Sequence, residues 1–145
     1  MIYRHRFQVN SPVERVAGFH SRSASMAAIT PPPIIIRVQQ APPVLRDGDE
    51  MDFTMWLGLF PIHWLARIEA VSLNGFTDRQ VSGPFAEWVH RHTFVEVNEQ
   101  TTEVVDEITL QLRSHPLWWL VGVGMQIGLP ALFAYRAWKT RRIMQ

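Results

Sequence analysis

The sequence contains no cysteine and no long block of like charges. Without cysteine, disulfide bonds, thiolate catalysis and cysteine-ligated metals are all excluded. This absence also fits a reducing compartment, so we expect a cytoplasmic protein. The 14 basic and 13 acidic side chains leave a formal net charge of +1 and form no basic stripe, which argues against a nucleic-acid partner. No apolar run follows the charges after Met1, so we expect no signal peptide.

The chain also lacks the strand–helix alternation that a doubly wound parallel sheet requires. Residues 2–9 alternate with a period of two, which indicates a strand, and two short helices are expected after it, near Pro12 and over residues 23–28. Breaks rich in Gly, Pro and Asn then separate further strands, so antiparallel hairpins are expected in one domain over residues 1–145. These strands are expected over residues 34–38, 51–57, 62–71, 76–81, 85–97 and 101–112.

One face of the predicted sheet is aromatic but interrupted by histidines and carboxylates. Because the turns are short, hairpin geometry places Asp78 opposite His90 and Asp106 opposite His92. Buried carboxylates need partners, and this register supplies an imidazole to each. The aromatic residues of the same face are Phe76, Trp88 and Phe94.

These four polar residues have two main interpretations. The first is an internal hydrogen-bond network that fixes the sheet. The second is the polar end of a ligand cavity or an acid–base pair, for which Asp78, His90, His92 and Asp106 are the catalytic candidates. A metal held by the two histidines is a third alternative, but carboxylate partners explain them equally well, so we expect neither a metal nor a cofactor.

Motifs in the centre of the chain resemble those of a known family. They are Phe76-x-Asp78-x-Gln80, Gly83-Pro84-Phe85, Trp88-x-His90-x-His92-x-Phe94 and Thr102-x-x-x-Asp106. This block is similar to a bacterial branch of the SRPBCC superfamily, which includes START-related lipid-transfer domains, pollen-allergen-like proteins and polyketide cyclases. Weaker matches lie near both ends, including Leu132-Phe133-Ala134-Tyr135-Arg136.

The resemblance implies an α+β helix-grip fold, in which a seven-stranded antiparallel sheet wraps around a long C-terminal helix and leaves a cavity for an apolar molecule. Some members are cyclases or dehydratases, but no catalytic motif carries over. The ligand-binding residues expected here are Phe53, Trp64, Phe76, Asp78, Trp88, His90, His92, Phe94, Ala131 and Tyr135.

The C-terminal segment could either span a bilayer or pack on the sheet. Residues 114–135 carry no charged side chain, and that length is enough to span a bilayer. However, the aromatic face of the sheet has no other long apolar element to cover it. We therefore expect residues 114–143 to pack on the sheet as two helices, one near Pro116–Ile127 and one from Pro130 to about Ile143, broken at Pro130.

Three functions follow from these observations. The first is a carrier that binds an apolar small molecule or lipid between the sheet and the C-terminal helix. The second is a cyclase or dehydratase in which His90 or His92 is the general acid/base and Asp78 or Asp106 orients it. The third is a membrane-associated module, either touching a bilayer through Leu117–Tyr135 or spanning it with that segment.

Overall fold

A seven-stranded antiparallel sheet forms the body of the protein in the computed structural model, which describes all residues from 1 to 145. Its strands are β1 (Ile2–Val9), β2 (Ile34–Gln40), β3 (Glu50–Leu57), β4 (Phe60–Ser72), β5 (Gly75–Ser82), β6 (Glu87–Asn98) and β7 (Thr101–Gln111). Their order in the sheet is β1-β7-β6-β5-β4-β3-β2, so β2 to β7 form a meander and β1 pairs with the last strand. The expected strand number and antiparallel pairing are confirmed.

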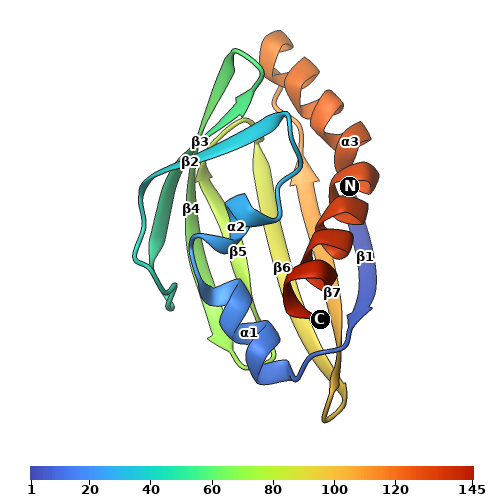
Figure 1. The fold of residues 1–145 in the computed structure, drawn as a ribbon. Helices are drawn as coiled ribbons and strands as arrows, with labels where there is room; N and C mark the ends of the chain where they lie inside the picture. The colour runs from blue at the N-terminus through green and yellow to red at the C-terminus, as the bar shows by residue number, and fades with distance from the viewer.

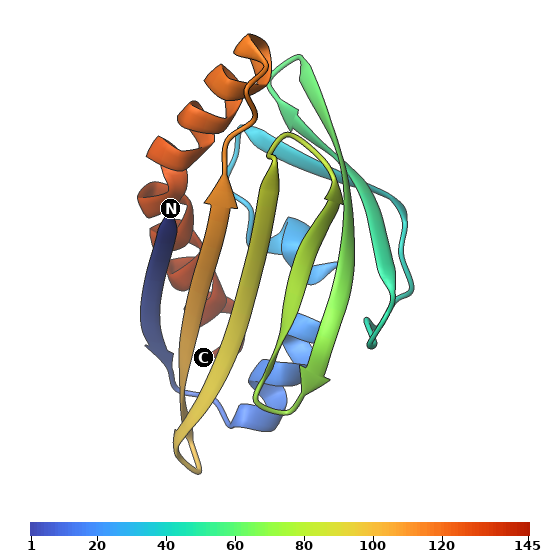
Figure 2. The ribbon, with the colours of Figure 1, turned by 180° about the vertical axis from the view of Figure 1, so that it is seen from behind.

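Three helices lie on one side of this curved sheet (Figure 1). Two short ones, α1 (Val13–Ser21) and α2 (Ser25–Ala28), connect β1 to β2, and the long α3 (Pro116–Met144) follows β7. Figure 2 shows the opposite side, where no helix covers the strands. The sheet therefore grips α3 on its concave face, as the predicted helix-grip fold requires.

The strand register matches the one that the hairpin turns predict. Asp78 on β5 pairs with His90 on β6, and His92 pairs with Asp106 on β7. Along β7 the even-numbered residues are buried and the odd-numbered ones are partly exposed, which is the period-two pattern of a half-buried strand. All four polar residues consequently project from the concave face.

The loop before β6 is longer than the sequence indicated. We expected a strand from Phe85, but β6 begins at Glu87. The backbone of Phe85 pairs with the side chain of Gln80 instead of with a neighbouring strand. Gln80 Nε2 donates to the Phe85 carbonyl at 2.8 Å, and the Phe85 amide donates to Gln80 Oε1 at 3.1 Å. These two bonds fix Phe85, which is fully buried, against the wall of the core.

The predicted break of the C-terminal helix at Pro130 is wrong. Helix α3 is continuous from Pro116 to Met144, with Pro130 inside it. An interior proline removes one backbone hydrogen bond, but packing on both sides of it holds the two halves in line. Leu129 and Phe133 bury their side chains against the sheet while Pro130 points to solvent.

Two clusters of buried hydrophobic residues make up the core. The larger one lies between the middle of the sheet and α3, around Trp64, Ile108 and Phe133. The smaller one lies between α1, the end of α3 and the strands β1, β6 and β7, around Val16 and Phe94. The space between the larger cluster and the helices is not completely filled.

Candidate functional site

A cavity of about 420 Å³ lies between the concave face of the sheet and the helices. Its walls come from β2 to β6 and from the facing sides of α1, α2 and α3, and 20 of its 31 lining residues are hydrophobic. Small-molecule sites are typically apolar concavities of about 300–1,000 Å³ with a few polar groups, so the size and lining fit a bound organic molecule.

The apolar wall contains four of the aromatic residues that the sequence placed there: Phe53, Trp64, Phe76 and Trp88. The rings of Phe53 and Trp64 stack with centroids 5.8 Å apart, and Trp88 meets Trp64 edge-on at 5.3 Å. This packing holds the rings in place and gives the cavity a rigid aromatic side.

Three of the expected lining residues lie elsewhere. Phe94 projects from the same face but is buried in the smaller cluster, with its ring 4.9 Å from His20. Ala131 and Tyr135 are on the outer side of α3, where Tyr135 packs on Trp138. The resemblance placed them on the cavity wall, but the continuous helix presents Leu132, Phe133 and Arg136 to the cavity instead.

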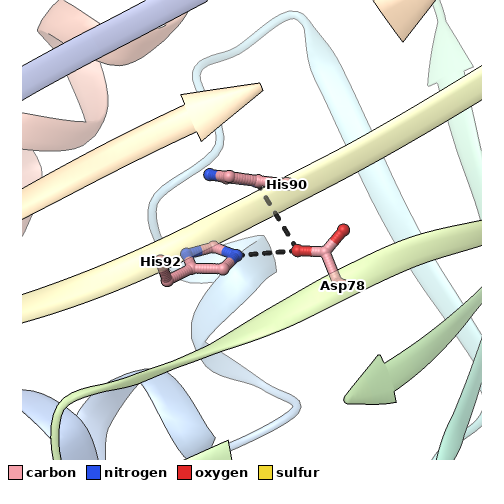
Figure 3. A group of neighbouring side chains, drawn as sticks. All are labelled: Asp78, His90 and His92. Atoms are coloured by element: carbon pink, nitrogen blue, oxygen red, sulfur yellow. Dashed lines mark hydrogen bonds and ion pairs between the residues drawn. The ribbon is translucent and has the colours of Figure 1, made fainter. Parts of the chain in front are cut away.

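Two histidines and two carboxylates form a closed ring at the polar end of the cavity. Figure 3 shows three of them, Asp78, His90 and His92. His92 Nε2 lies 2.7 Å from Asp78 Oδ2, and His90 Nε2 lies 2.8 Å from Asp106 Oδ1. The remaining ring nitrogens are also close, with His90 Nδ1 3.5 Å from Asp78 and His92 Nδ1 3.4 Å from Asp106. Asp78, His90 and His92 line the cavity, whereas Asp106 lies behind them.

The two imidazoles of this ring carry different charges. Burial alone would lower the pKa of His92, but hydrogen bonds to Asp106 and Asp78 raise it to about 9, so His92 is an imidazolium at neutral pH. Burial and the neighbouring His92 charge lower the pKa of His90, which is therefore neutral. Burial works against both carboxylates, yet their histidine partners keep the pKa of Asp78 and of Asp106 below the ordinary value. The ring thus holds two negative charges and one positive charge.

Comparison with known proteins identifies the architecture. No protein-family model and no curated protein matches the sequence. Solved structures do match: the Zhui aromatase/cyclase of a Streptomyces species has a TM-score of 0.70 at 14% identity, over 99% of this chain and 95% of that one. A START superfamily protein of Mycobacterium smegmatis has a TM-score of 0.66 at 10% identity, over 96% and 98%. A Thermus thermophilus protein has a TM-score of 0.69 at 18% identity, over the full length of both chains.

The chain has the helix-grip fold of START and aromatase/cyclase proteins. This agrees with the SRPBCC resemblance seen in the sequence, and at these identities it establishes the fold alone. The helix-grip architecture explains why residues from β5, β6 and α3 meet in one cavity although they are far apart in the sequence.

Sequence reasoning missed Arg136, which the helix-grip fold places on the cavity wall. Its guanidinium lies over the Phe133 ring, 5.4 Å from the centroid, and its Nε is buried without a hydrogen-bond partner. Burial lowers the pKa of Arg136 and the charges of Asp106 and Asp78 raise it; arginine keeps its charge in proteins. The available signal was its position three residues after Phe133, which puts both on one helix face.

His20 is the second lining residue that the sequence did not single out. Its Nδ1 donates to the Val16 carbonyl at 2.9 Å within α1, and its ring lies 6.4 Å from that of His92. Burial lowers the pKa of His20 to about 4, so it is neutral near pH 7. The helix-grip cavity therefore contains two neutral imidazoles, His20 and His90.

Asp78, His90 and His92 could also serve as metal ligands, because one donor atom from each lies within 4.8 Å of the others. All three already interact within the ring, and His92 carries a proton on the nitrogen that faces Asp78. A metal ion would have to displace that proton and break the 2.7 Å bond. The same atoms suit acid–base chemistry: an imidazolium and a neutral imidazole with centroids 3.7 Å apart, beside a carboxylate.

Proposed function

We propose that the protein binds an apolar small molecule or lipid in the cavity between the sheet and α3. The observation that carries this proposal is the cavity itself, which is large enough for an organic molecule and mostly hydrophobic. The structural likeness to a START superfamily protein and to an aromatase/cyclase supports it, because the helix-grip fold is typical of proteins that bind hydrophobic ligands. The apolar part of the molecule would contact Phe53, Trp64 and Trp88, with its polar end toward Asp78 and His90.

A cavity-filling substitution tests the proposal. Ala66 is buried on β4 and lines the cavity, so Ala66→Phe would occupy the binding volume. Ala134→Phe makes the same chemical change on the exposed side of α3 and is the matched control. Native mass spectrometry of the purified protein and displacement of an apolar dye should show binding in the wild type and in Ala134→Phe, and its loss in folded Ala66→Phe. Equal dye binding by all three proteins would contradict the proposal.

An enzymatic role is the second candidate, favoured by the differently protonated His90 and His92 at the edge of the cavity. In this role the neutral His90 would accept a proton and Asp106, bonded to its Nε2, would orient it. Turnover of a poly-β-ketone substrate should then fall by about 10²-fold or more in His90→Gln. Turnover that is unchanged in both His90→Gln and His92→Gln would remove the enzymatic role.

Contact with a membrane surface is a further part of the proposal. The β3–β4 turn lies beside the start of α3 in both views (Figures 1 and 2). We call the exposed apolar residues of these two segments, Leu59, Phe60, Leu117, Trp119 and Leu120, the tip. Leu59 is 97% and Leu120 64% exposed, and Phe60 lies 6.3 Å from Trp118. Leu120 also lines the cavity, so the tip continues into the binding space. Exposed aromatic and aliphatic groups of this kind insert into the lipid interface.

Vesicle flotation tests this contact. Leu59→Ser with Trp119→Ser should reduce flotation with phosphatidylcholine vesicles, whereas Leu73→Ser with Val97→Ser, each 49% exposed at the opposite end of the sheet, should not. By length and composition alone, α3 could also cross a bilayer. We favour surface contact over spanning because the buried side of α3 covers the cavity. Cell fractionation without detergent separates cytoplasmic, surface-bound and membrane-spanning protein.

A further inference from the structure

Arg136 is a partly buried cation of the cavity wall without an acidic partner; the other arginine of the wall, Arg22, also has none but is exposed to solvent. No carboxylate lies within ion-pair distance of the Arg136 guanidinium, and its buried Nε has no acceptor. A buried donor left unpaired is unfavourable, and a buried charge more so. The contact with the Phe133 ring compensates only in part, because a ring face supplies no hydrogen-bond acceptor.

The nearby acidic residues are engaged elsewhere. Asp78 Oδ2 accepts from His92, and Asp106 Oδ1 accepts from His90 and faces the second nitrogen of His92. The ring is therefore held together by its own histidines, and neither of its carboxylates forms an ion pair with Arg136. The guanidinium instead borders the space in which we propose that cargo binds.

We propose that Arg136 binds the carboxylate of an apolar carboxylic acid, held with its hydrocarbon part against the aromatic wall. This inference rests on the proposed binding function and specifies the polar end of the ligand. A guanidinium pairs with a carboxylate through two parallel N–H···O bonds, which satisfies the orphaned donor and the charge together. A phosphate monoester fits less well, because its second negative charge would lie near Asp78, and the other arginine of the wall, Arg22, is exposed to solvent.

The surrounding groups can tolerate one added negative charge. The ring carries one net negative charge, which Arg136 balances in the absence of ligand. A bound carboxylate adds another, but it pairs directly with Arg136, and the two neutral imidazoles of the cavity, His20 and His90, do not repel it.

Matched acid and ester ligands test the inference. We would measure the affinities of dodecanoic acid and anthracene-2-carboxylic acid, each beside its methyl ester, by dye displacement at pH 7. For whichever scaffold binds, the acid should bind about tenfold tighter than the ester or better. In Arg136→Met, which keeps an apolar side chain and removes the charge, that ratio should fall close to one. Arg142→Met, on the exposed part of the same helix beside Trp138, should leave it unchanged.

The outcomes separate this inference from the proposed function. Equal affinity of acid and ester in the wild type, or an acid preference that survives in Arg136→Met, would overturn the role of Arg136 while leaving the binding function intact. Failure of both scaffolds in both forms would count against the binding function itself. If Arg136→Met does not fold, Arg136→Lys keeps the charge without the planar fork and should retain part of the acid preference.

Discussion

His92 on β6 forms its short hydrogen bond, 2.7 Å long, with Asp78 on β5, although its direct cross-strand neighbour on β7 is Asp106. His90 likewise forms its short hydrogen bond with Asp106 on β7, although its direct cross-strand neighbour on β5 is Asp78. Both short bonds are thus diagonal, and each imidazole also faces its direct partner at about 3.5 Å or less. As a result the four side chains tie β5, β6 and β7 together at the end of the cavity.

Stability should fall on the alkaline side because of His92. Its pKa is raised to about 9 in the folded state by Asp106 and Asp78, above the ordinary 6.5. This contribution is fully present below pH 6.5 and is lost as the pH rises through about 9, with a slope of at most about 1.4 kcal/mol per pH unit. Urea unfolding between pH 6 and 10 should show the decline.

The alkaline decline should disappear in His92→Gln, which cannot bind the extra proton. His63→Gln is the matched control, since His63 also lies 2.7 Å from an aspartate, Asp52, but at the exposed surface. It should change the unfolding free energy by less than about 1 kcal/mol. An alkaline slope that persists in His92→Gln would show that another group causes it.

The loss of folding stability at acidic pH should be caused partly by His20. Burial lowers the pKa of this residue to about 4, so the unfolded chain binds its proton more readily than the folded one. The contribution of His20 is therefore complete above pH 6.5 and is lost as the pH falls toward 4. Imidazole NMR should show His20 neutral at pH 5.5; a midpoint near 6.5 would contradict its burial.

Substitution of Gly75 should be strongly unfavourable. Gly75 has a φ of 143°, and a β-carbon there would collide with the His92 carbonyl oxygen on the adjacent strand. Gly75→Ala should lower the unfolding free energy by at least about 1 kcal/mol. The control is Gly18→Ala on α1, where a β-carbon meets no atom within 4 Å and should stabilise the helix by about 0.5–1 kcal/mol. Denaturant unfolding of both variants checks the opposite signs.

Pro130→Ala should stabilise the protein. The substitution restores the backbone hydrogen bond that a proline cannot donate and removes the clash with the preceding turn, worth up to about 3 kcal/mol in a helix interior. Because Pro130 is exposed, no core contact is lost. The denaturation midpoint should therefore rise at an unchanged slope. A lower midpoint would indicate that the proline shapes the curvature of α3 over the sheet.

Much of the sheet could be predicted because strand alternation and short turns are local properties. They placed Asp78 opposite His90 and Asp106 opposite His92, and they placed Trp88 on the concave face. The diagonal choice of hydrogen-bond partner was not predictable, because it depends on side-chain rotamers across three strands. A period-two pattern determines which face of the sheet a side chain is on, but it does not determine the rotamer or the hydrogen-bond partner.

The C-terminal helix was harder to predict because its outcome depends on packing. Pro130 is a strong local breaker, yet burial of Leu129 and Phe133 on either side overrides it. The resemblance named Ala131 and Tyr135 as lining residues, but the face of α3 that meets the cavity carries Phe133 and Arg136. Which residues of a helix face a cavity can be predicted only when the rotation of the helix about its axis is known.

The strand order also constrains how the molecule assembles. Within β2 to β7, each strand pairs with its neighbour in the sequence. In contrast, β1 pairs with β7, about 100 residues later in the chain, and α3 is synthesised after all seven strands. Local pairings form readily and distant ones slowly, so the aromatic inner wall can exist on the ribosome before its cover emerges. During that interval the nascent chain presents an uncovered apolar surface, and a hydrophobic cargo or a chaperone able to shield it would favour completion of the fold.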